Sequence, residues 1–125
     1  MKSAYLIGTT SAALERVAEA WRARPGVDSG PGVIQWFDSG FLFNVSTESD
    51  DYQESDWREG WRESESTHAE PPEEGSSWYI ECRSEEVFAR ILREAALLSP
   101  GRLWVLDSND VLWPAEAIDP ARIVL

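Results

Sequence analysis

The chain is poor in the residues that form disulfides and zinc sites. Its 125 residues include one cysteine, Cys82, and one histidine, His68. A lone cysteine excludes an internal disulfide, and two such residues are too few for the common cysteine-rich zinc modules. We therefore expect no metal and no other cofactor, and we interpret Cys82 as a small apolar residue of the core.

Basic residues and long apolar runs are also scarce. Eleven Lys and Arg stand against 23 Asp and Glu, which gives a net charge of −12. This balance disfavours attraction to nucleic acid or to an anionic membrane. The first eight residues carry one positive charge and an apolar run shorter than a secretory or membrane-spanning segment. We expect a cytoplasmic protein with neither nucleic acid nor membrane as a partner.

Apolar and aromatic residues, in contrast, are plentiful. They make up 42% and 11% of the chain, enough for one hydrophobic core without the help of a metal or disulfide. We predict a single α+β domain over residues 1–125, interrupted by an acidic insertion at residues 48–74.

Hydrophobic periodicity and stop signals define the expected elements. A helix should begin near Thr10, bury Leu14, Val17, Ala18 and Trp21, and end before Pro25, and a second should follow Ser84 with an apolar stripe reaching Leu98. Strands are expected at residues 4–7, 33–37, 41–46, 77–83, 103–106 and 111–113. Residues 38–40 should form a three-residue hairpin loop, 27–32 a surface connection, and 123–125 one more edge strand. The pattern predicts two helices on one face of a largely antiparallel sheet of about six or seven strands.

Residues suited to catalysis occur only in settings that disfavour it. His68 lies in a polar run bounded by prolines, where an imidazole is hard to hold rigidly. Cys82 belongs to the apolar set of a strand, whereas reactive thiols favour exposed, electropositive settings. The Asx-rich stretch 107–110 is typical of a hairpin turn held by side-chain to backbone hydrogen bonds. We therefore expect no catalytic residues and a protein that is not an enzyme.

The acidic insertion is the most unusual part of the sequence. Residues 48–74 hold eleven acids and two bases, so their net charge is −9, and the rest of the chain carries only −3. Trp57 and Trp61 lie four residues apart in this stretch, and a short helix over about 51–65 would align their indoles. One interpretation is that the indoles attach the insertion to the domain while its charges face water.

The other interpretation is a surface for binding a basic protein. Tryptophan is favoured at interface hot spots, and complementary charge speeds the encounter of two proteins. The predicted partner-binding residues are Asp50, Asp51, Asp56, Trp57, Glu59, Trp61, Glu63 and Glu65. The two interpretations coexist if one indole is buried and the other is presented.

In overall character the chain resembles the immunity proteins of bacterial polymorphic toxin systems. The likeness lies in its small size, its acidity, its Trp-containing insertion and its segments Trp78–Arg83 and Leu103–Trp113. It implies a protein that neutralises a cognate toxin by tight binding, here a basic toxin whose active site is covered. No residue role is transferred, because no motif specific to one family is matched.

Two other classes remain open on the sequence alone. One is a small-ligand or enzymatic domain with a pocket lined by Trp36, Trp78 or Trp104. The other is an acidic mimic of nucleic acid, which would need carboxylates spaced like phosphates along one surface. Exposed indoles would also allow a homodimer.

Overall fold

The computed structural model describes residues 2–47 and 75–125. They form seven strands, two α-helices and one short 3-10 helix in the order β1 (Ser3–Gly8), α1 (Ser11–Arg22), β2 (Asp28–Gly30), β3 (Val33–Asp38), β4 (Phe41–Ser46), β5 (Ser76–Cys82), α3 (Glu85–Leu98), β6 (Leu103–Leu106), β7 (Leu112–Pro114) and η1 (Ala115–Ala117). The predicted α+β fold is confirmed.

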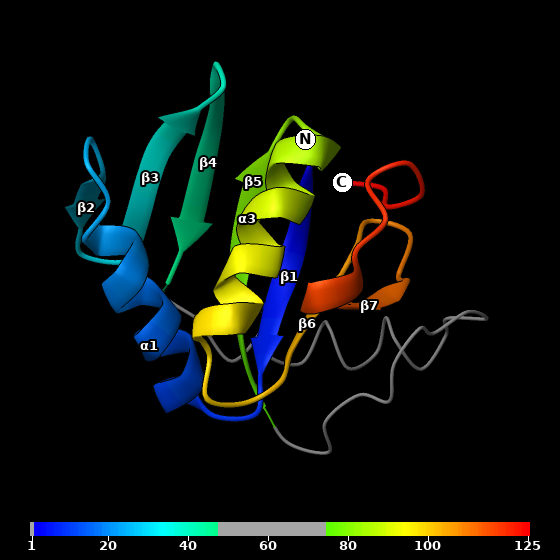
Figure 1. The fold of residues 1–125 in the computed structure, drawn as a ribbon, viewed down its shortest axis with the longest axis horizontal. Coiled ribbons are helices and arrows are strands. Elements are labelled where there is room, and N and C mark those ends of the chain that lie inside the picture. The colour runs from blue at the N-terminus through cyan, green and yellow to red at the C-terminus, as the bar shows by residue number, and fades with distance from the viewer. Residues whose placement is uncertain (1, 48–74) are drawn as a thin grey trace.

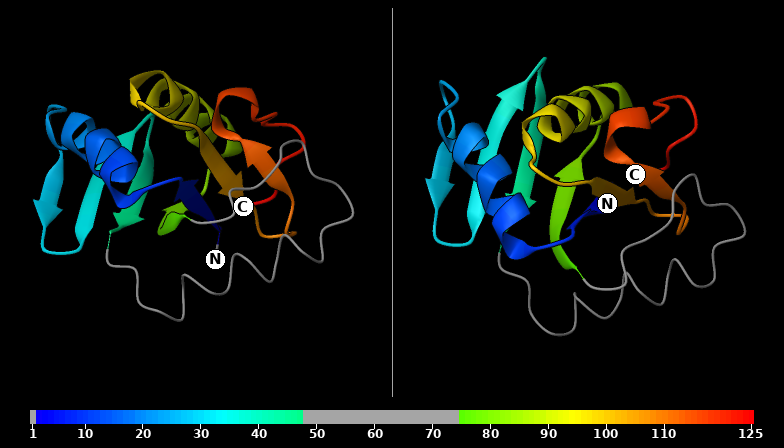
Figure 2. Two further views of the ribbon diagram at one scale, coloured as in Figure 1. Left: turned by 90° about the horizontal axis from the view of Figure 1, so that it is seen from below. Right: turned by 60° about the horizontal axis from the view of Figure 1, so that its bottom comes forward.

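All seven strands belong to one open sheet in which every neighbouring pair is antiparallel. The strand order is β2-β3-β4-β5-β1-β6-β7, so β1 lies inside the sheet between β5 and β6. Helices α1 and α3 lie side by side on the same face of this sheet (Figures 1 and 2). The first strand of the chain therefore holds together segments that are far apart in the sequence.

Both helices begin at a side-chain cap, as the sequence predicts. The Thr10 hydroxyl accepts a hydrogen bond from the Ala13 amide at 3.2 Å, and the Ser84 hydroxyl accepts one from the Val87 amide at 3.2 Å. Each cap satisfies an amide that the first turn of a helix leaves without a backbone partner. The predicted apolar faces are buried against the sheet, except that Leu98, the last residue of α3, is half exposed.

The sheet has apolar side chains on both faces. Among the described residues, five tryptophans are buried: Trp21, Trp36, Trp78, Trp104 and Trp113. The main core lies between sheet and helices, where the Trp36 and Phe43 rings are 4.8 Å apart. Because side chains alternate along a strand, Ile7 and Trp104 lie on the other face, in a second, smaller buried cluster.

Three expectations about local structure are wrong. Residues 28–30 form the edge strand β2, because backbone pairing with β3 needs no apolar side chain. The hairpin loop has two residues rather than three: Asp38 pairs with Phe41, and only Ser39 and Gly40 turn, both with positive φ (53° and 84°). Two-residue turns of this kind fit the twist of the flanking strands.

The C-terminal tail, lastly, adds no edge strand. It is η1 followed by irregular chain, in which Ile123 and Leu125 are buried. The backbone groups of Val124 bond to the Asp107 carboxylate and the Ser108 amide, which replaces pairing with a strand.

Candidate functional site

The residues predicted to bind a partner all lie outside the described residues. Asp50, Asp51, Asp56, Trp57, Glu59, Trp61, Glu63 and Glu65 belong to the stretch 48–74, as does His68. Their role therefore stays a prediction. The described residues contain three polar or ionisable groups whose chemistry could serve a function, around Cys82, Asp38 and Asp107. They also form an exposed apolar surface.

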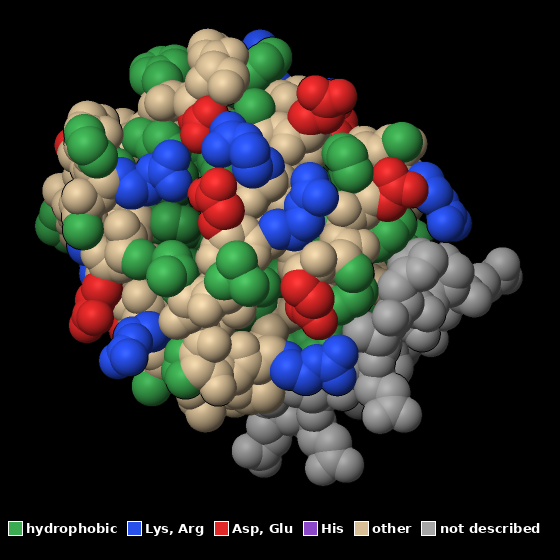
Figure 3. Space-filling view, in the orientation of Figure 1, with side chains coloured by type: hydrophobic (Ala, Val, Ile, Leu, Met, Phe, Trp, Pro, Cys, Tyr) green, Lys and Arg blue, Asp and Glu red, His purple; other side chains and the backbone are tan. Residues whose placement is uncertain are grey.

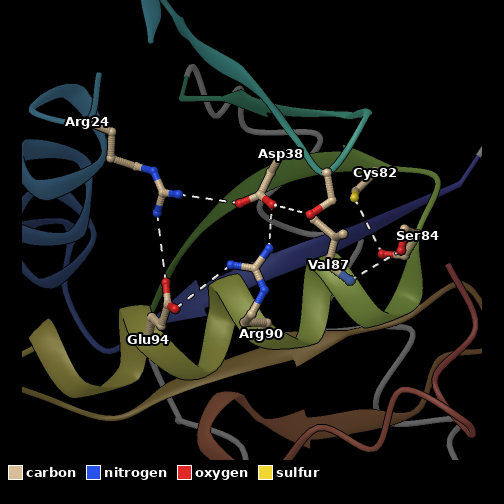
Figure 4. Close-up of polar contacts among 8 residues, drawn as sticks. Arg24, Asp38, Cys82, Ser84, Val87, Arg90 and Glu94 are labelled. Carbon is tan, nitrogen blue, oxygen red and sulfur yellow. Dashed lines mark hydrogen bonds and ion pairs between the residues drawn. The ribbon is translucent and has the colours of Figure 1, made fainter. Parts of the chain in front are cut away.

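Cys82 is part of the core. Its side chain is buried at the end of β5, and its thiol donates to the carbonyl oxygen of Ser84 over 3.5 Å (Figure 4). Burial raises the pKa of the Cys82 thiol, and the nearby carboxylates of Glu85 and Asp38 act in the same direction. The thiol is therefore held in its protonated form, which agrees with a structural rather than a nucleophilic cysteine.

Asp38 joins the β3–β4 hairpin to both helices. Its carboxylate accepts a hydrogen bond from Arg90 of α3 and lies 3.4 Å from the Nη2 atom of Arg24, just beyond α1 (Figure 4). Glu94 lies 3.8 Å from Arg24 and 3.9 Å from Arg90, so two acids and two bases form one neutral network. The Arg24 guanidinium also stacks 4.8 Å above the Trp36 ring.

This network lowers the pKa of the Asp38 carboxyl group. Burial alone would raise its pKa, but hydrogen bonds from Arg90 and Ser39 and the positive charges of Arg90 and Arg24 hold the pKa below its ordinary value of 3.8. Asp38 is therefore ionised at neutral pH and serves to attach the hairpin to the helices.

Asp107 is a buried carboxylate with four donors. Its Oδ1 accepts from the amides of Asn109 at 2.9 Å and Val111 at 3.0 Å. Its Oδ2 accepts from the Trp113 indole at 3.0 Å and from the Val124 amide at 3.3 Å. Asp107 therefore closes the β6–β7 turn and fixes the tail, and the predicted Asx-rich turn is confirmed.

Among residues 2–47 and 75–125, no three His, Cys, Asp or Glu side chains gather in a group that could hold a metal ion.

Among the described residues, an exposed apolar surface lies at the end of the β3–β4 hairpin. Phe37 is 74% exposed, Phe41 41% and Leu42 40%. These side chains border a hollow of about 510 Å³, whose other lining residues are Lys2, Gly40, Asn44, Glu81, Cys82 and Arg83. On the helix side of the molecule, acids and bases are interspersed over the surface (Figure 3).

The sequence contains a signal for this surface that the strand prediction does not use. Phe41, Leu42 and Phe43 are consecutive, and so are Trp36 and Phe37. Since neighbouring strand residues point to opposite faces, such runs place apolar side chains on the outer face as well as in the core. Trp36 and Phe43 are buried beneath the helices, and Phe37 and Leu42 are left on the outer face.

No protein-family model, no curated protein and no solved structure matches the chain. Among the described helices, none is both long enough and apolar enough to cross a bilayer.

Proposed function

We propose that the chain is a non-enzymatic binding protein, of the immunity-protein kind, that neutralises a basic toxin by covering its active site. The observation that carries this proposal is the uneven distribution of charge. Residues 48–74 bear −9 of the net −12 and include two tryptophans, whereas the other 98 residues bear −3. Concentrated acid around aromatic side chains suits a basic protein partner.

The polar groups of the scaffold support this proposal, because the main ones are already engaged in contacts within the fold. Asp38 and Asp107 are held by arginines and by backbone and indole donors, and Cys82 packs in the core. These groups stabilise the fold. Most of the net negative charge lies in the insertion, outside these groups.

The proposed mechanism combines electrostatic attraction with steric blocking. Asp50, Asp51, Asp56, Glu59, Glu63 and Glu65 would pair with Lys or Arg of the toxin, and Trp57 or Trp61 would fill a pocket. Exposed pairs contribute about 0 to 1 kcal/mol each and mainly raise the association rate. A buried indole contributes on the order of 2 kcal/mol or more and mainly slows dissociation.

The test begins with co-purification of the full chain with the protein encoded beside it. Binding kinetics are then measured for Trp57→Ala and Trp61→Ala, with Leu97→Ala on α3 as the matched control, since Leu97 is 86% exposed on the scaffold. We expect at least one indole variant to dissociate ten-fold faster or more, on the order of the free energy above. The control should leave the kinetics unchanged.

A second set of variants tests the electrostatic part. Glu59, Glu63 and Glu65 are changed together to Gln, and the exposed scaffold acids Glu15, Glu19 and Glu86 form the control set. The first set should slow association at low salt, and the difference should shrink as salt screens the charges. Identical kinetics for both indole variants and both charge sets would overturn the proposal. Dependence on the carboxylates alone would favour a nucleic-acid mimic.

A further inference from the structure

We propose that the outer face of the β3–β4 hairpin is the interface of a homodimer, in which two copies of this chain meet around a two-fold axis. This hairpin face consists of Phe37 and Leu42, bordered by Glu81 near the end of β5 and by Arg83 just after that strand. The proposal is independent of the toxin-binding role, because it rests only on described residues outside the insertion.

The centre of the hairpin face is apolar. Phe37 and Leu42 are direct cross-strand partners, and they project away from the helices because their neighbours Trp36 and Phe43 are buried on the helix side. An exposed aromatic side chain next to an exposed leucine favours burial against a second apolar surface.

The border of the hairpin face carries one charge of each sign. Glu81 of β5 and Arg83, one residue beyond the end of that strand, both line the hollow beside Phe37 and Leu42. Within the described part of the chain, neither side chain makes an ion pair. Lys2 also lines the hollow, but it is neutralised by Glu85 at 2.6 Å.

This arrangement of charges identifies the partner as a second copy. A two-fold interface uses the same surface twice, so it must be complementary to itself. With Phe37 and Leu42 near the axis, Glu81 of each copy faces Arg83 of the other, and both charges are paired. A partner of uniform charge would leave one of them opposed by a like charge.

The hairpin face is also well placed for a dimer. It lies at one end of β4 and β5, whereas Ser46 and Ser76, which flank the insertion in sequence, lie at the other end of these strands (Figure 1). Six strand residues separate the two ends by roughly 17–20 Å. Two copies meeting at the hairpin would therefore leave the points where the insertion joins the scaffold away from the interface.

The first test is sedimentation velocity of the full chain from micromolar to millimolar concentration. We expect a reversible monomer–dimer equilibrium for the wild type, monomer for Phe37→Glu, and wild-type behaviour for the control Leu97→Glu, which places the same charge on an exposed apolar residue of α3. A wild type that is monomeric throughout, or a dimer unaffected by Phe37→Glu, overturns the proposal.

The second test distinguishes a two-fold interface from any other contact. Glu81→Arg or Arg83→Glu alone should weaken the dimer on the order of ten-fold, because each brings like charges together twice. The double variant E81R/R83E should restore wild-type affinity, since the exchanged charges again meet their opposites across the axis. Loss of affinity in the double variant equal to or greater than that in the single variants would overturn the two-fold arrangement.

Discussion

Asp107 holds together the β6–β7 turn and the C-terminal tail. Two backbone amides of its own turn, one amide of the C-terminal tail and the Trp113 indole all donate to its carboxylate. A buried donor that loses its acceptor loses a large part of its hydrogen-bonding free energy without regaining water.

The change Asp107→Asn should therefore lower the free energy of unfolding by about 3 kcal/mol, because the amide nitrogen cannot accept the hydrogen bonds that the lost oxygen accepted. Urea denaturation measures the effect. The control is Asp119→Asn, whose carboxylate accepts one exposed bond from the Ala121 amide at 2.9 Å and should cost well under about 1 kcal/mol. Equal losses in the two variants would contradict the role assigned to Asp107.

The lowered pKa of Asp38 makes the free energy of unfolding depend on pH. Its pKa is lower in the folded protein than its ordinary value of 3.8, so folding favours the ionised form. The resulting stabilisation is fully present above the unfolded pKa and is lost as the pH falls through the folded pKa. The side chain is 13% exposed and its arginine partners more so, which limits the effect to about 1 kcal/mol.

Thermal unfolding of Asp38→Asn tests this expectation. The variant should melt below the wild type at pH 7, and the difference should shrink as the pH is lowered past 3.8. Glu15→Gln is the control, since the Glu15–Arg22 pair is exposed and 3.5 Å long. A difference between Asp38→Asn and wild type that persists unchanged into acid would show that the Asp38 charge is not the cause.

The helices illustrate how local signals set the limits of an element. Ser84 starts α3 because its hydroxyl accepts from the Val87 amide, and Glu85 and Glu86 follow in the first turn, where the helix dipole favours anions. Ser84→Ala should lower the free energy of unfolding by about 1 kcal/mol, whereas Ser84→Asp, which keeps an acceptor, should stay near wild type. Chemical denaturation distinguishes them, and equal losses would show that capping is not the main role of Ser84.

The strands show where local signals are insufficient. Alternation in β5 predicts its buried side chains Trp78, Ile80 and Cys82, because the inner face needs apolar residues. In β2 all three residues are exposed, so no periodicity marks the strand, and only its backbone pairing with β3 reveals it. The tail shows the reverse case, since Ile123 and Leu125 are apolar enough for a strand but find a place in the core without one.

At the scale of the whole molecule, we propose two binding regions that differ in charge and in partner. The insertion carries most of the negative charge and is proposed to bind a basic partner, whereas the hairpin face is apolar with balanced charges and is proposed to bind a second copy. Phe37→Glu and Trp57→Ala separate the tasks experimentally, because each changes one surface only. The proposal of a basic partner rests on the composition of residues 48–74. The proposal of a dimer rests on where Phe37, Leu42 and Glu81 lie in the sheet.

The amino-acid order by itself determines the caps of both helices, the alternating strands and the concentration of charge in residues 48–74, because these depend on neighbours a few residues apart. It also indicates the layered α+β plan. Only the tertiary structure decides that β1 lies between β5 and β6, and that Glu81 and Arg83 lie beside Phe37 and Leu42. The reason is physical: the same alternating pattern fits many pairings of strands, and the packing of the assembled sheet and helices selects one.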